Sequence, residues 1–227
     1  MAATQRQVGY NKTTVRSADD FYTTPPGAVE ALLRCEKFSG RGWEPACGNG
    51  AISRYFPGMI ASDIRTDPDV AGERGVDFLR TRRRVDYIVM NPPFSLALRF
   101  LERALECAPK VAMLNRLLFL EGIGRYPFFV RHPPARVHVF ADRITCNPPG
   151  ERRGNLVCYA WFVWQRGHEG APTLDWIFSD LKKMPAAAGR RGSVRVPRIL
   201  MPGAVAVLAA LLKSALGRPE RTAVCLN

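Results

Sequence analysis

One stretch decides the fold of this 227-residue chain: Val85-Asp-Tyr-Ile-Val-Met-Asn-Pro-Pro-Phe94. Its first six residues are mostly apolar, which predicts a buried strand over residues 85–90. The strand has to stop at Asn91, because two consecutive prolines remove two backbone donors and stiffen the loop. Ligands of open α/β sheets bind outside the carboxyl ends of the strands. We therefore expect the chemistry of this protein at the Asn-Pro-Pro-Phe loop.

Short apolar segments alternate with amphipathic segments on both sides of this stretch. This alternation predicts an α/β fold with a doubly wound, mostly parallel sheet. No helical pattern separates the last two expected strands, so we expect them to pair, with an antiparallel strand at the sheet edge. The expected strands cover residues 41–45, 59–62, 85–90, 111–114, 135–140 and 156–164, and the expected helices cover residues 25–35, 48–55 and 96–107.

A glycine turn precedes the stretch, in Glu44-Pro-Ala-Cys-Gly-Asn-Gly50. Gly48 and Gly50 let the backbone pass close to a ligand. Asp63 ends the next strand. Its separation from Glu44 along the chain is close to the ~20 residues at which dinucleotide folds place their ribose-binding acid. Asp77 follows at a third strand end. Acids at successive strand ends suit a ligand that carries hydroxyls, an amine and an adenine ring.

The composition favours a polyanionic partner. The formal net charge is +13, from 33 Lys and Arg against 20 Asp and Glu. Each phosphate contact of a basic surface releases a counterion, although a basic solvated surface or tail explains the same excess. The six cysteines form no CxxC pair and only three histidines accompany them, so we expect neither a zinc site nor a disulfide framework.

The chain shows no sign of a membrane or secretory segment. The longest apolar run, residues 204–212, is too short to span a bilayer, and residues 1–20 contain no apolar core. Scattered cysteines without a signal peptide favour a reducing compartment, and we expect a cytoplasmic protein of a bacterium or a phage-infected host.

Three parts are expected along the chain: a flexible arm over 1–20, one domain over 21–179, and a basic tail over 180–227. The tail holds nine Lys or Arg and two acids, with one amphipathic helix near 203–216. Its composition favours a disordered tail with a nascent helix. The alternatives are a nucleic-acid clamp and a partner-binding helix.

In its motifs the sequence resembles the amino-methyltransferases of nucleic acid, especially small phage-type adenine-specific DNA methyltransferases. Phe21-Tyr-Thr-Thr-Pro-Pro26 looks like their amino-proximal cofactor motif, residues 44–50 like their glycine motif, and residues 91–94 like their catalytic (D/N/S)PP(Y/F/W) motif. Residues 117–122 and 159–164 are also similar to those proteins. The resemblance covers about residues 18–178.

The resemblance implies methyl transfer from S-adenosylmethionine to the exocyclic amine of adenine in DNA, without a metal. Asn91 and the carbonyl of Pro92 would accept the hydrogens of the target amine, and Phe94 would stack on the extruded base. Asp63 would accept from the ribose hydroxyls and Asp77 from the cofactor adenine. The implied catalytic residues are Asn91, Pro92, Pro93 and Phe94, and the implied cofactor-binding residues are Thr23, Thr24, Pro25, Glu44, Ala46, Gly48, Gly50, Asp63, Asp77 and Phe78.

We find no insert resembling a target-recognition domain, so recognition of double-stranded DNA would fall to short basic loops. The loop over residues 146–155 is the preferred contact, although any single arginine is as well explained as a solvated charge. A second Asn-Pro-Pro, at 147–149, precedes a glycine and is expected to be a turn. The candidate contacts are residues 80–84, Arg116, Arg125, Arg143, Arg152 and Arg153.

Several other functions share features of this sequence. RNA adenine methyltransferases and protein glutamine methyltransferases also carry an Asn-Pro-Pro-aromatic loop, and the basic surplus argues against a protein substrate. A catalytically silent nucleic-acid-binding module would keep the fold, but both motifs are intact. A NAD-dependent dehydrogenase lacks support, since the third glycine of GxGxxG is absent.

Overall fold

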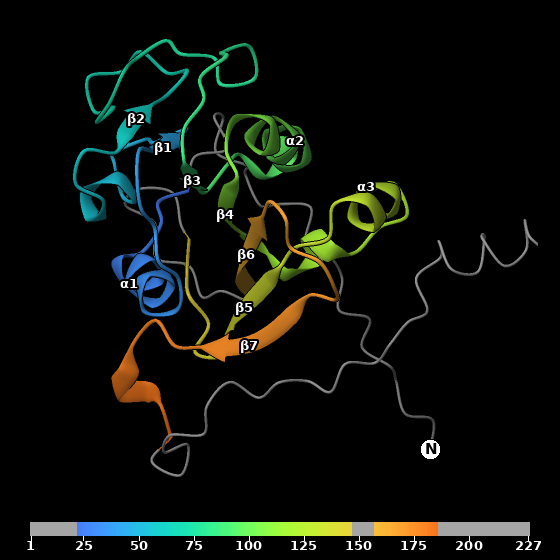
Figure 1. The fold of residues 1–227 in the computed structure, drawn as a ribbon. Coiled ribbons are helices and arrows are strands. Elements are labelled where there is room, and N and C mark those ends of the chain that lie inside the picture. Colours follow the sequence, from blue (N-terminus) through green and yellow to red (C-terminus); the bar gives the residue numbers. More distant parts are fainter. Residues whose placement is uncertain (1–21, 147–156, 186–227) are drawn as a thin grey trace, which may run out of the picture. The chain divides into compact units, whose positions relative to one another are not determined.

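The computed structural model describes residues 22–146 and 157–185 (Figure 1). They build one seven-stranded sheet in the order β2-β1-β3-β4-β6-β5-β7. The strands are β1 (Gly42–Pro45), β2 (Ile60–Ser62), β3 (Tyr87–Met90), β4 (Lys110–Arg116), β5 (Arg136–Phe140), β6 (Tyr159–Gln165) and β7 (Thr173–Ile177). The α-helices are α1 (Pro26–Cys35), α2 (Ala97–Cys107) and α3 (Tyr126–Arg131), and the 3-10 helices are η1 (Ser53–Tyr55), η2 (Phe94–Leu96), η3 (Leu117–Leu120) and η4 (Leu181–Lys183).

The predicted fold class is confirmed, with one difference in the position of the antiparallel strand. β5 and β6 pair antiparallel as expected, but β6 also pairs antiparallel with β4 and thus lies inside the sheet. β7 pairs parallel with β5 and forms the edge. The reason is burial: the first six residues of β6 are buried, whereas β7 is mostly part-exposed or exposed and suits an edge.

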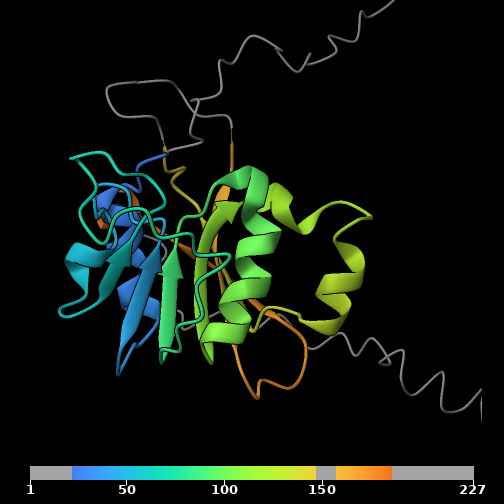
Figure 2. The same ribbon diagram turned by 90° about the horizontal axis from the view of Figure 1, so that it is seen from above.

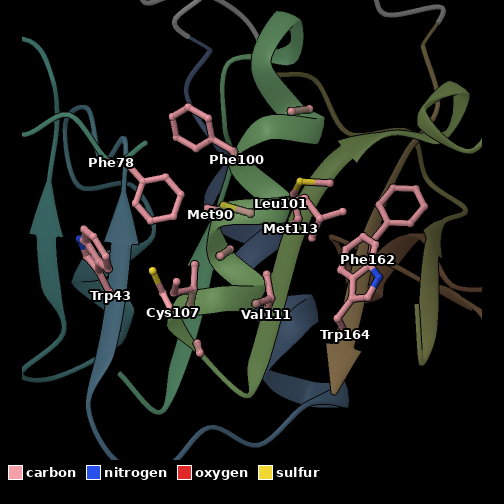
Figure 3. Packing of buried hydrophobic residues seen from close by; sticks show 14 of the residues in the cluster. Trp43, Phe78, Met90, Phe100, Leu101, Cys107, Val111, Met113, Phe162 and Trp164 are labelled. Atoms are coloured by element: carbon pink, nitrogen blue, oxygen red, sulfur yellow. The ribbon is translucent and has the colours of Figure 1, made fainter. Parts of the chain in front are cut away.

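Side chains of the sheet pack into two hydrophobic clusters, one on each face. α1 covers one face and α2 and α3 cover the other (Figure 2). Successive strand residues alternate between the two, so Met113 faces α2 and Leu114 faces the α1 side. Figure 3 shows the α2-side cluster, in which Phe78 and Phe100 lie above the strands. Trp161 and Trp164, both in β6, are buried in the sheet core.

The helix expected over residues 48–55 is wrong. Those residues form successive turns that end in η1. Gly48 and Gly50 have φ angles of 51° and 71°, in the left-handed region. A right-handed helix cannot begin through such residues, so the glycine turn stays a loop until Ser53.

Several predictions fall outside the described residues: the arm over 1–20, most of the tail, the second Asn-Pro-Pro, and Arg152 and Arg153. Within the part of the chain that the structure describes, five cysteines are free thiols. None of its helices combines the length and the apolar character that crossing a bilayer requires. Nor do its His, Cys, Asp and Glu side chains form a group of three or more that could hold a metal ion.

Candidate active site

A cavity of about 510 Å³ lies where β1, β2 and β3 end. Its position is the one at which open α/β sheets bind ligands, and its volume suits a small molecule. The predicted residues that line it are Thr23, Thr24, Glu44, Ala46, Asp63, Asp77, Phe78, Asn91 and Pro93. Pro25, Gly48, Gly50, Pro92 and Phe94 are not among its lining residues.

Residues that the sequence analysis did not single out complete the wall. Three of them, Asn49, Leu96 and Phe100, follow or sit beside the predicted motifs, and a fourth is the exposed Arg99. The exposed Arg80, one of the candidate nucleic-acid contacts, also lines the cavity. Nearness to a motif was the available signal for Asn49, which stands between the two glycines. The remaining additions are Tyr22, Cys47, Ala51, Ile64, Arg65, Val76 and Leu79.

The side-chain amide of Asn91 is held in one orientation. Its Nδ2 donates to the carbonyl oxygen of Tyr22 at 2.9 Å and to Oγ1 of Thr24 at 3.0 Å. Both amide hydrogens are thereby used. The Oδ1 atom is buried and has no hydrogen-bond partner among the described residues. A buried acceptor without a donor costs free energy, so this oxygen marks a place where the donor of a ligand fits.

The carboxylate of Asp63 fixes the glycine turn. Oδ2 accepts from the backbone N–H of Gly48 at 2.8 Å, and Oδ1 accepts from that of Arg65 at 2.9 Å. A carboxylate oxygen accepts more than one hydrogen bond, so these contacts leave capacity for ligand hydroxyls. Gly50 is needed for packing, since a Cβ there would come within 2.8 Å of the Ala71 Cβ. The glycines therefore shape the turn from behind the cavity wall.

Asp77 and Phe78 form a second part of the wall. Oδ1 of Asp77 accepts from the backbone N–H of Leu79 at 2.9 Å, which fixes the carboxylate at the start of a turn. The ring of Phe78 packs edge-on against Trp43 at 4.9 Å between centroids and against Phe100 at 5.1 Å. Phe78 thus belongs to the core and presents only part of its surface to the cavity.

Glu44 is a buried carboxyl group at the end of β1. It is 2% exposed, and its Oε2 accepts from the backbone N–H of Ser53 at 2.7 Å. Burial raises the pKa of Glu44 to about 8, and hydrogen bonds from Ser53 and Ile52 and the charge of Arg54 offset this only in part. The carboxyl group of Glu44 therefore holds a proton near neutral pH.

The raised pKa of Glu44 makes the stability of the free protein pH-dependent. Between the ordinary value of 4.5 and about 8, the folded state keeps a proton that the unfolded state releases, so stability falls as pH rises through this window. Glu44→Gln keeps an acceptor for Ser53 and cannot titrate. We expect the melting temperature of Glu44→Gln minus that of the wild type to be larger at about pH 9 than at about pH 5. Glu102→Gln, at an exposed position of α2, is the control. A constant difference between Glu44→Gln and the wild type would contradict the raised pKa.

Phe94 lies on the other side of the Asn-Pro-Pro-Phe loop, with the α1-side cluster. Its ring is tilted against Tyr22 at 5.1 Å and against Tyr159 at 6.1 Å between centroids. Tyr22 therefore contacts the loop twice, through its carbonyl to Asn91 and through its ring to Phe94.

The candidate nucleic-acid arginines differ in their surroundings. The guanidinium of Arg125 donates to the carbonyl oxygens of Leu118, Phe119 and Glu121, so it closes its own loop. Arg83 pairs with Glu73 at 2.9 Å. Arg143 is exposed and has a φ of 38°. Arg116 lies over the ring of Phe94.

No family model matches the chain, and no curated protein matches it. Solved structures do. A predicted class I S-adenosylmethionine-dependent methyltransferase of Listeria monocytogenes is 10% identical with a TM-score of 0.51, over 70% of this chain and 66% of that one. The modification subunit of a predicted type I restriction enzyme from Vibrio vulnificus is 13% identical with a TM-score of 0.51, over 90% of this chain and 55% of that one. At these identities the likeness shows the fold alone: this chain has the fold of class I S-adenosylmethionine-dependent methyltransferases.

Proposed function

We propose that the protein transfers a methyl group from S-adenosylmethionine to the exocyclic amine of adenine in DNA. One observation carries the proposal: the Asn91 amide, tied by Tyr22 and Thr24, with its Oδ1 left as a buried acceptor at the cavity wall. An acceptor fixed in this way suits a substrate that presents an N–H group.

The residues of the cavity fit the cofactor. Two carboxylates, Asp63 and Asp77, suit a ligand that carries positive charge and hydroxyls, and Phe78 and Phe100 offer apolar surface to a flat ring. Asn49 Oδ1 is a second buried acceptor without a partner in the described part of the chain. The bound cofactor supplies an electrophilic methyl group on its sulfonium.

Asn91 would act on the target amine through its free oxygen. The amine of adenine is a poor nucleophile, because its lone pair is delocalised into the ring. A hydrogen bond to Oδ1 draws one N–H out of the ring plane and frees the lone pair for in-line approach to the methyl group. The contribution is positional and electrostatic, and the two tethers of Asn91 supply it in advance.

Charge supports a nucleic acid as the substrate. The chain carries +13, and the exposed Arg80 and Arg99 line the cavity, where backbone phosphates would approach a base held inside. A protein amide offers no phosphate to these arginines. RNA adenine would satisfy the same geometry and is the second candidate substrate.

A transfer assay tests the proposal directly. Purified protein is incubated with isotopically labelled S-adenosylmethionine and either unmethylated duplex DNA or structured RNA, and the nucleosides are identified by mass spectrometry. We expect labelled N6-methyladenine from DNA. Label in RNA alone would replace the substrate and keep the site. Absence of label despite measurable cofactor binding would favour a silent nucleic-acid-binding module.

A further inference from the structure

Arg116 places a positive charge directly behind the Asn-Pro-Pro-Phe loop. It is the last residue of β4 and lies opposite Tyr159, the first residue of β6. Its guanidinium carbon is 4.4 Å from the centre of the Phe94 ring. Arg116 does not line the cofactor cavity. The charge therefore stands on the Phe94 side of the loop, apart from the cofactor-binding residues.

The guanidinium of Arg116 differs from the other cations that lie over aromatic rings in the described part of the chain. Its Nε is buried without a hydrogen-bond partner among the described residues. Within residues 22–146 and 157–185, three other cations lie over aromatic rings, and each has an oxygen partner. Arg83 pairs with Glu73, Lys110 donates to Glu36 at 2.7 Å, and Arg125 donates to the carbonyl oxygen of Phe119 at 2.8 Å.

Among residues 22–146 and 157–185, no carboxylate pairs with the half-buried guanidinium of Arg116, so an external anion would stabilise it. Burying an unpaired N–H donor of a charged group is unfavourable, and the face of Phe94 offsets this only in part. A planar guanidinium matches the oxygen spacing of a phosphate. In a protein with a net charge of +13, the phosphates of nucleic acid are the anions that fit.

We propose that Arg116 binds a backbone phosphate of the nucleic-acid substrate, and that the ring of Phe94 holds its guanidinium in place until the phosphate arrives. This inference rests on the proposed function, because it assigns a partner to the same loop. It separates Arg116 from two other candidate arginines, Arg83 and Arg125, which already have oxygen partners. When the guanidinium moves to the phosphate, it exposes one face of Phe94 beside the substrate.

The test is a salt series of DNA binding with the full chain. Arg116→Met keeps an apolar contact with Phe94 and removes the charge. Arg166→Met removes the same charge at the opposite end of β6, where the exposed Arg166 donates to the Leu105 carbonyl. Binding of a mixed-sequence duplex is followed by fluorescence anisotropy without cofactor, and the melting temperature of each variant checks its folding.

We expect Arg116→Met to weaken binding about tenfold and to lower the slope of log affinity against log salt by about one. Arg116→Lys should keep the slope, because it keeps the charge, and Arg166→Met should match the wild type. Equal slopes for Arg116→Met and the wild type would overturn the inference. If Arg116→Met does not fold, the same comparison is made with Arg116→Gln. If Arg116→Met lowers the salt slope but the wild-type protein transfers no methyl group, the proposed function is overturned and the phosphate contact of Arg116 stands.

Discussion

Replacing Asn91 with Ala is expected to lower the rate of methyl transfer by about 10²–10³-fold, the usual loss for one preorganised polar group of an active site. The variant loses the only Asn91 atom that is free to meet the substrate, since Nδ2 is occupied by Tyr22 and Thr24. S-adenosylmethionine should still bind within a few-fold of the wild type, about a threefold change at most, because Asp63 and Asp77 are untouched. Single-turnover rates and calorimetric titration separate the two effects.

A matched pair of variants at Thr24 tests whether the orientation of the amide matters. Thr24→Val removes the acceptor for Nδ2 and keeps the shape of a residue that is only 4% exposed. Thr24→Ser keeps the hydroxyl. We expect the Val variant to be about tenfold slower than the Ser variant, since one of two tethers is lost. Full activity of Asn91→Ala would contradict a role of the Asn-Pro-Pro-Phe loop in methyl transfer.

Replacing Glu36 with Gln is expected to lower the free energy of unfolding by about 3–5 kcal/mol, the range for removing one partner of a buried ion pair. Glu36 is 5% exposed and receives Lys110 Nζ at 2.7 Å, Arg136 Nη2 at 3.0 Å and His138 Nε2 at 3.0 Å. His138 also contacts Asp175 Oδ2 at 3.0 Å through Nδ1. A neutral side chain would leave these cations without their shared carboxylate. Glu169→Gln, at an exposed position, is the control in urea unfolding.

The same cluster sets limits on stability at both ends of the pH range. Burial opposes the charge of Glu36, but hydrogen bonds from His138, Arg136 and Lys110 outweigh it and hold the pKa at about 2. The stabilisation by Glu36 is therefore present above pH ~4.5 and lost as pH falls toward 2. Burial also opposes charge on His138, and its bonds to Asp175 and Glu36 raise the pKa above 6.5. That contribution is lost as pH rises through the raised value. A Glu36→Gln profile parallel to that of the wild type would contradict this account.

Strands with continuous apolar runs could be predicted from the sequence, and the edge strand β7 could not. Residues 87–90 of β3 and 159–164 of β6 are buried at every position, which requires apolar residues on both faces of the strand. β7, Thr-Leu-Asp-Trp-Ile, has one face open to solvent, and its Trp176 is 57% exposed. Its sequence carries no run that distinguishes it from a loop. These residues form a strand because they pair with β5 in the folded sheet.

The site shows the same division. The acids at strand ends were predicted to share one cavity, because parallel strands end at one edge of the sheet, and Glu44, Asp63 and Asp77 do line it. The strand end expected at Asp77 is wrong, since in the described part of the chain no strand lies between β2 and β3 and Asp77 starts a turn. The tethers of Asn91 were not predicted, because Tyr22 and Thr24 lie 69 and 67 residues away in the chain. They reach Asn91 only through the packing of α1 against the sheet. Phe94 was expected beside the substrate, and the contact with Arg116 over its ring has no sequence signal.

The position of β6 constrains the order in which the chain can assemble. β2, β1, β3 and β4 pair only with one another and, at β4, with β6, so the parallel half can form once Arg116 has been synthesised. β5 has no neighbour earlier in the chain, because its partners are β6 and β7. It gains its first strand partner only when β6 is available, which requires synthesis as far as Gln165. We therefore expect the second half of the sheet to form after the parallel half, and β5 to lack a strand partner until β6 has been synthesised.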